Sequence, residues 1–76
     1  MTDSGYENLA NGIIVQACKD YRDALKKLKR NPKHRESLSV KKDVEEFFRS
    51  DWFDVLTTLD GEMLIKKIRE EIKYDG

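Results

Sequence analysis

Several residue types are scarce in this chain of 76 residues, and each scarcity removes a class of structure. Cys18 is the only cysteine, so no disulfide forms within the chain. One cysteine and one histidine, His34, are also too few for a structural zinc site. No apolar run approaches the ~18 residues that span a bilayer, and no secretion signal follows Met1. We therefore expect a small cytoplasmic domain held together by helix packing.

Charge is balanced in total but separated along the chain. There are 15 basic and 15 acidic residues, which argues against a bulk nucleic-acid binder, since such proteins usually carry net positive charge. The stretch 26–35 nevertheless contains six cations and no acid: Lys26, Lys27, Lys29, Arg30, Lys33 and Arg35. This basic segment would attract phosphate backbones or an acidic protein surface. A simpler explanation is that these cations stabilise the carboxyl end of a helix, where the helix dipole is negative.

A repeating apolar stripe predicts a long first helix over about 5–30. Its members follow one another in steps of four and three: Ala10, Ile14, Ala17, Tyr21, Ala24 and Leu28. This rhythm keeps one narrow face apolar, and the alanines let another helix approach closely. Ser4 and Glu7 have the spacing of a capping box at its start. The stripe packs either inside the fold or, through Ala10, Ala17 and Ala24, against a second copy in a homodimer.

Three further helices are predicted after Asn31-Pro32, because proline disfavours helical backbone in the residue before it. They cover about 39–49, 51–58 and 60–73, and Asp60 caps the last one. The short helix over 51–58 is apolar nearly all round, so we expect it to lie wedged between other elements. No stretch has the alternation of a strand. The chain is predicted to be one all-α domain, 1–76, a small bundle of three main helices plus a short Trp-containing helix.

The first helix is expected to be longer than the rest of the fold. About 25 helical residues span roughly 37 Å, whereas a globule of this size measures about 30 Å across. Aliphatic residues stop at Leu28 while cations continue to Arg30. We therefore expect the carboxyl end of this helix to overhang the core as a charged tip.

Acidic and aromatic residues gather in the second half of the chain. We interpret the acidic ones as a solvated helix face, with complementarity to the basic segment or mimicry of DNA as alternatives: Asp43, Glu45, Glu46, Asp51 and Asp54. Trp52-Phe53 follows Phe47-Phe48 closely. Adjacent helical residues cannot both point straight inward, so at least one of these four rings should lie near the surface or in a subunit contact. We favour Trp52 and Phe53 as core residues. If exposed, they are candidate anchors for a protein partner.

The sequence contains little that would support catalysis, and we predict that the chain is not an enzyme. A nucleophile with its base would need Cys18 or a serine near His34, but Cys18 lies beside the apolar stripe and His34 in a polar turn. No glycine-rich phosphate loop occurs, and Asp60-Gly61-Glu62 is too short for a calcium loop. We predict no cofactor and no metal.

Two stretches, Ala10–Arg22 and Ser50–Gly61, resemble short and mostly uncharacterised proteins of phages, prophages and integrative elements of Gram-positive bacteria. The similar motifs are apolar helix faces and a Trp-containing turn, and they bring no catalytic or ligand residues. The resemblance implies an accessory protein inside a bacterial host. Small proteins of that setting often bind and inhibit a host or defence protein, anti-CRISPR proteins being one kind. We predict a protein-binding function, with phosphate-mediated nucleic-acid binding by the basic segment as the alternative.

Overall fold

Four helices make up the fold: α1 (Asp3–Arg30), α2 (Arg35–Phe48), α3 (Asp51–Leu56) and α4 (Gly61–Ile72). The computed structural model describes residues 3–74, with side chains from Ala10 to Tyr74. No strand occurs in residues 3–74, and the predicted all-α class is confirmed. None of the helices described is both long and apolar enough to cross a membrane.

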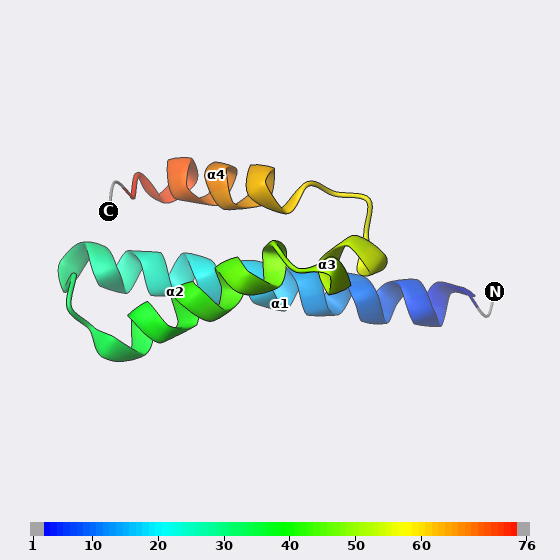
Figure 1. The fold of residues 1–76 in the computed structure, drawn as a ribbon. Coiled ribbons are helices and arrows are strands. Elements are labelled where there is room, and N and C mark those ends of the chain that lie inside the picture. Colours follow the sequence, from blue (N-terminus) through cyan, green and yellow to red (C-terminus); the bar gives the residue numbers. More distant parts are fainter. Residues whose placement is uncertain (1–2, 75–76) are drawn as a thin grey trace.

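The long helices α1 and α2 form an antiparallel pair, and α4 packs against both of them (Figure 1). The chain reverses direction at 31–34, and α3 with the loop after it carries the chain over to α4. The molecule is elongated and measures 45 × 20 × 18 Å. Its length follows from α1, because 28 helical residues span about 42 Å.

The carboxyl end of α1 is packed, so the overhang predicted there is wrong. Leu28 is only 2% exposed, and Lys29 Nζ donates a hydrogen bond of 2.8 Å to the carbonyl oxygen of Ile72 at the end of α4. The short turn at 31–34 sends α2 directly back along α1, and α4 ends beside the same region. Figure 1 shows that the amino-terminal end of α1 extends past α3 instead.

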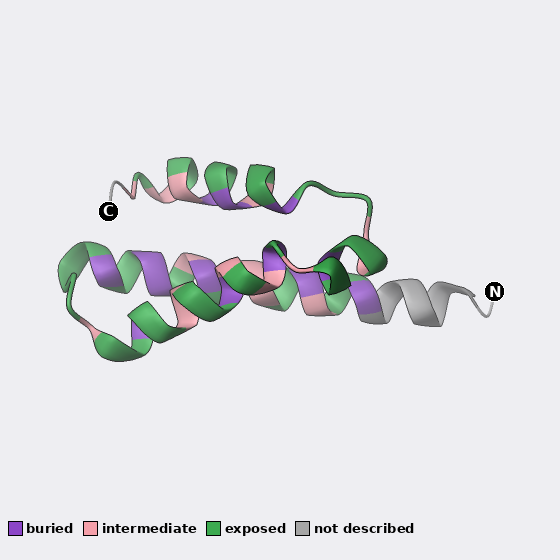
Figure 2. Cartoon of the chain, in the orientation of Figure 1, coloured by how far each residue is buried: buried purple, intermediate pink, exposed green. Residues whose placement is uncertain are grey.

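The apolar stripe of α1 forms the centre of the core (Figure 2). All of its predicted members are buried except Ala17, which is half-buried, and Leu25 beside the stripe is buried as well. The other helices contribute the remaining core side chains: Val44, Phe48, Phe53, Ile65 and Ile68. Because Ala10 and Ala24 are covered within one chain, only Ala17 of the three alanines remains accessible to a second copy.

Helix α2 begins at Arg35, four residues before the predicted start at 39, because His34 caps it. His34 Nδ1 accepts a hydrogen bond of 3.2 Å from the Ser37 backbone N–H and lies 2.8 Å from Ser37 Oγ. Ser37 is buried, although the sequence places it in a polar linker. Pro32 lies in the turn between α1 and α2, as the predicted break there requires.

Helix α3 is not wedged between other elements, contrary to the prediction from its apolar residues. Phe53 is fully buried, but Trp52 is 56% exposed and Val55 is 74% exposed. Ser50 caps the helix, its Oγ accepting a 3.2 Å hydrogen bond from the Phe53 N–H. The six residues of α3 lie at the edge of the bundle, so only one of their faces meets the core.

Helix α4 begins and ends close to the predicted boundaries. Asp60 caps α4 as predicted, its Oδ1 accepting a 3.0 Å hydrogen bond from the Glu62 N–H. The helix ends at Ile72, followed by Lys73 in a left-handed conformation with φ 60°. The side chains of the predicted capping box, Ser4 and Glu7, lie outside the described residues, and α1 begins before them.

Candidate functional site

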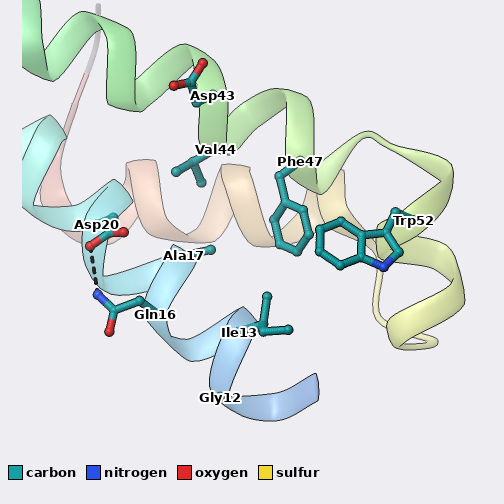
Figure 3. Close-up of a pocket in the computed structure, with 9 residues that line it drawn as sticks. All are labelled: Gly12, Ile13, Gln16, Ala17, Asp20, Asp43, Val44, Phe47 and Trp52. Atoms are coloured by element: carbon teal, nitrogen blue, oxygen red, sulfur yellow. Dashed lines mark hydrogen bonds between the residues drawn. The ribbon is translucent and has the colours of Figure 1, made fainter. Parts of the chain in front are cut away.

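An open groove of about 550 Å³ runs between α1 and α2 and ends at α3 (Figure 3). Its lining comes from three helices: Gly12, Ile13, Gln16, Ala17, Asp20, Asp43, Val44, Phe47 and Trp52. Helix α4 packs on the opposite side of the α1–α2 pair, where Glu71 forms an ion pair with Arg22 of α1 and Arg69 pairs with Glu45 of α2. The groove is therefore the side of the pair that α4 leaves uncovered.

The floor of the groove is apolar because of the spacing of residues on the two helices. Ile13 and Ala17 are one turn apart on α1, and Val44 and Phe47 are one turn apart on α2, so each pair shares a helix face. Ala17 has no side chain beyond Cβ, which leaves the middle of the floor open. The arrangement offers apolar surface in a concave shape, as binding sites for apolar groups do.

Trp52 stands at one end of the groove, exposed yet fixed in position (Figure 3). Its ring lies edge-to-face on Phe47, with 5.4 Å between centroids. Phe47 in turn stacks edge-to-face on the buried Phe53 at 5.6 Å and contacts Phe48 at 5.7 Å. This aromatic chain connects the exposed indole to the core. Of the four rings considered from the sequence, Trp52 is the exposed one, and Phe53 is excluded as a partner-binding residue by its burial.

Two carboxylates occupy the other end of the groove. Asp20 projects from α1 and Asp43 from α2, both at the end away from Trp52 (Figure 3). Gln16 Nε2 donates a hydrogen bond of 2.9 Å to Asp20 Oδ1. Among residues 10–74, no lysine or arginine belongs to the lining. The groove thus has an apolar aromatic end and an anionic end.

Glu45 organises a polar cluster on the side of α4, which the sequence did not reveal. Tyr21 OH donates a hydrogen bond of 2.5 Å to Glu45 Oε2, and Lys41 Nζ lies 3.3 Å from the same oxygen. Arg69 Nη2 lies 3.6 Å from it and stacks on the ring of Tyr74. The interpretation of Glu45 as part of a solvated acidic face is therefore wrong. A tyrosine within a buried stripe needs a hydrogen-bond partner for its hydroxyl. The position of Tyr21 in the stripe was therefore the feature of the sequence that could have indicated this cluster.

The surroundings of this pair move both pKa values away from their ordinary range. Burial alone would raise the pKa of Glu45, but the hydrogen bond from Tyr21 and the charges of Lys41 and Arg69 outweigh it and lower the pKa. Burial, together with the hydrogen bond to Glu45, raises the pKa of Tyr21. The cluster thus favours an ionised carboxylate and a neutral phenol, and its contacts join α1, α2 and α4.

The six cations of the basic segment are all exposed and lie outside the groove. Lys26, Lys27 and Arg30 line a shallow hollow at the carboxyl end of α1 together with Asp23. Lys29 bonds to the end of α4. The remaining acidic candidates, Asp43, Glu46, Asp51 and Asp54, are exposed as predicted. Of the residues considered from the sequence, Ala17, Asp43, Phe47 and Trp52 line the groove. The groove residues that the sequence did not indicate as binding residues are Gly12, Ile13, Gln16, Asp20 and Val44.

Cys18 and His34 are both engaged in structural roles. Cys18 is half-buried beside the core, and burial, partly offset by Arg22 and reinforced by Glu71, raises the pKa of its thiol. His34 uses Nδ1 to cap α2. Among the residues whose side chains are described, no three His, Cys, Asp or Glu side chains gather as metal ligands would.

No protein-family model, no characterised protein and no solved structure matches this chain. The assignment of a function therefore depends on the geometry of the groove and of the basic segment.

Proposed function

We propose that this chain is a non-enzymatic accessory protein of a phage or other mobile element, which binds a host or defence protein in the bacterial cytoplasm. The setting, and an inhibitor of the anti-CRISPR kind as one form of it, rest on the resemblance carried by Ala10–Arg22 and Ser50–Gly61. The protein-binding activity rests on the groove. The roles of His34 as a cap and of Cys18 as a half-buried thiol with a raised pKa support a non-enzymatic function.

The observation that carries the proposal is the position of Trp52, which is exposed beside an open apolar groove and yet packed against Phe47. Tryptophan is among the residues that contribute most to protein interfaces. A ring already held in place loses little conformational freedom on binding, so more of its contact energy remains as affinity. Exposed apolar surface in a concave site is typical of a binding surface.

A test is to capture the partner from bacterial lysate, purify it and titrate it against the chain by calorimetry. We expect Trp52→Ala to weaken saturable binding by about 30-fold or more, as substitution of a hot-spot residue does. Val55→Ala is the matched control, because Val55 is more exposed than Trp52 but does not line the groove. Failure to obtain a saturable partner, or equal affinity of the Trp52→Ala chain, would contradict the proposal.

The alternative function is nucleic-acid binding through phosphates by the basic segment. It is favoured by the exposure of its six cations around the end of α1 and the turn that follows. It predicts that log affinity for labelled DNA or RNA falls with log salt by about 0.9 per phosphate neutralised. Replacing Lys26, Lys27 and Arg30 with glutamine should reduce this slope, while Lys66→Gln, an exposed cation on α4, should have a smaller effect. Binding that is absent at low salt or indifferent to salt would exclude this alternative.

A further inference from the structure

The walls of the groove have the shape that receives a helix. Ile13, Ala17 and Asp20 follow each other along α1 at intervals of four and three residues, over a length of about 10 Å. Asp43 and Phe47 form the matching row on α2 at an interval of four. Two such rows of side chains leave a channel between them, and the side chains of a third helix fit into a channel of this kind. The small residues at the floor let its backbone come close.

The charges of the groove determine which charge a helix bound there should carry. Asp20 and Asp43 bring two negative charges from different helices to one end of the groove. Their side chains form no ion pair within residues 10–74, and the only hydrogen bond to either carboxylate there comes from Gln16. A lysine or arginine on an incoming segment would offset these two negative charges, whereas an acidic residue would add to them.

A second copy of this chain does not offer the complementary surface among its described residues. Leu28, at the basic end of α1, is 2% exposed because it packs in its own core. The exposed apolar side chains that do lie among cations are single ones, Leu38 on α2 and Met63 on α4. Neither helix therefore presents a row of apolar side chains that matches the floor of the groove. A basic amphipathic helix of a partner would complement both the apolar end and the anionic end of the groove. A second copy would complement only the anionic end.

We infer that the groove between α1 and α2 binds an amphipathic α-helix of the partner protein. Its apolar face lies over Phe47 and Trp52, and its lysine or arginine lies over Asp20 and Asp43. This inference rests on the proposed protein-binding function and adds the kind of segment that the partner contributes. The bound helix would cover the side of the α1–α2 pair opposite α4.

Synthetic peptides without tryptophan provide the test, because Trp52 is the single tryptophan of the chain and reports on the groove by its emission. The first peptide carries leucines on one helical face and lysines beyond the last leucine. The second has glutamate in place of lysine, and the third has the first composition with the leucines scattered around the helix. We expect saturable binding of the first with a blue shift of Trp52 emission, about tenfold weaker binding of the second, and no blue shift with the third.

Substitutions in the chain locate the peptide. Asp20→Asn combined with Asp43→Asn should weaken binding of the lysine peptide about tenfold and remove its advantage over the glutamate peptide. Glu46→Gln is the matched control, because Glu46 is an exposed acid of α2 outside the groove lining. Ala17→Gln fills the floor and should abolish binding, with circular dichroism to verify that the chain is still helical. The aspartate variants test the inference even if Ala17→Gln fails to fold.

Three results would overturn the inference: equal affinity for the lysine and glutamate peptides, no effect of the two aspartate substitutions, or a dimer in sedimentation that Ala17→Gln dissociates. The last result would assign the groove to a second copy. If a captured partner depends on Trp52 but not on Asp20 and Asp43, the protein-binding function stands and the basic helix is wrong. If the lysine peptide binds as expected but no protein requires Trp52, the proposed function is the part that fails.

Discussion

Replacing Tyr21 with phenylalanine tests the polar cluster that joins three helices. The substitution keeps a ring that is 0% exposed and lies edge-to-face on Phe48. It removes only the hydroxyl that donates to Glu45 at 2.5 Å. A hydrogen bond to a charged group contributes about 1.5–3 kcal/mol. Because Lys41 and Arg69 still pair with Glu45, the carboxylate is not left unpaired, and we expect a loss of about 2 kcal/mol.

That loss would be easy to measure in a domain of this size. At roughly 0.05–0.15 kcal/mol per residue the free energy of unfolding of the whole chain is about 4–11 kcal/mol, and 2 kcal/mol lowers Tm by about 8–16 °C. Urea denaturation followed by circular dichroism gives the free energy directly. Tyr74→Phe is the control, because the Tyr74 hydroxyl makes no hydrogen bond within residues 10–74, and its effect should stay below about 0.5 kcal/mol. An equally small effect for Tyr21→Phe would refute the pairing.

The same pair makes stability depend on pH in two ranges. The pKa of Glu45 is lowered on folding, so its contribution is present above its unfolded value, about 4.3, and is lost as pH falls through the folded value. The pKa of Tyr21 is raised on folding, so its contribution is complete below about pH 10 and is lost as pH rises further. Tyr21→Phe should flatten the alkaline decline in stability and shrink the acid one. Identical declines in both proteins would contradict this.

Three further changes test local features. Gly61→Ala places a Cβ 1.9 Å from the carbonyl oxygen of Phe48, so the backbone must move, and urea denaturation should show a loss of about 3 kcal/mol or more. Gly12→Ala places a Cβ with no atom within 4 Å and should stabilise α1 by about 0.5–1 kcal/mol; destabilisation would show that the groove is filled there. The raised pKa of Cys18, caused chiefly by burial, predicts slower alkylation by iodoacetamide near neutral pH than in the urea-unfolded chain, and equal rates would contradict it.

The parts of the fold that were predictable are those in which one local pattern suffices. The stripe from Ala10 to Leu28 repeats for five turns, so its phase identifies the buried face of α1 even across Gly12. The start of α4 is equally local, because an aspartate oxygen reaches the N–H of Glu62 two residues further on. Each of these elements is determined by residues that are neighbours on the chain.

The parts that were missed depend on contacts between distant residues. Glu45 differs from Glu46 because Tyr21, 24 residues away, and Arg69 of α4 reach its carboxylate. The early start of α2 depends on His34, whose ring nitrogen caps the helix although histidine is not among the preferred capping residues. Trp52 and Phe53 have similar chemistry, and the direction of α3 after the Ser50 cap decides which ring faces the core. Sequence patterns show which residues are apolar but not which neighbour covers them.

The open groove is a consequence of how the chain divides its length among the helices. A pair of long helices has two sides, and the 12 residues of α4 cover one of them. The remaining helix, α3, has six residues and spans about 9 Å, too short to cover the other side. It covers only the end of the groove, where it places Trp52 against Phe47. The apolar rows of Ile13 with Ala17 and of Val44 with Phe47 therefore have no covering helix on the groove side within residues 3–74, and this is the place that the inferred partner helix would take.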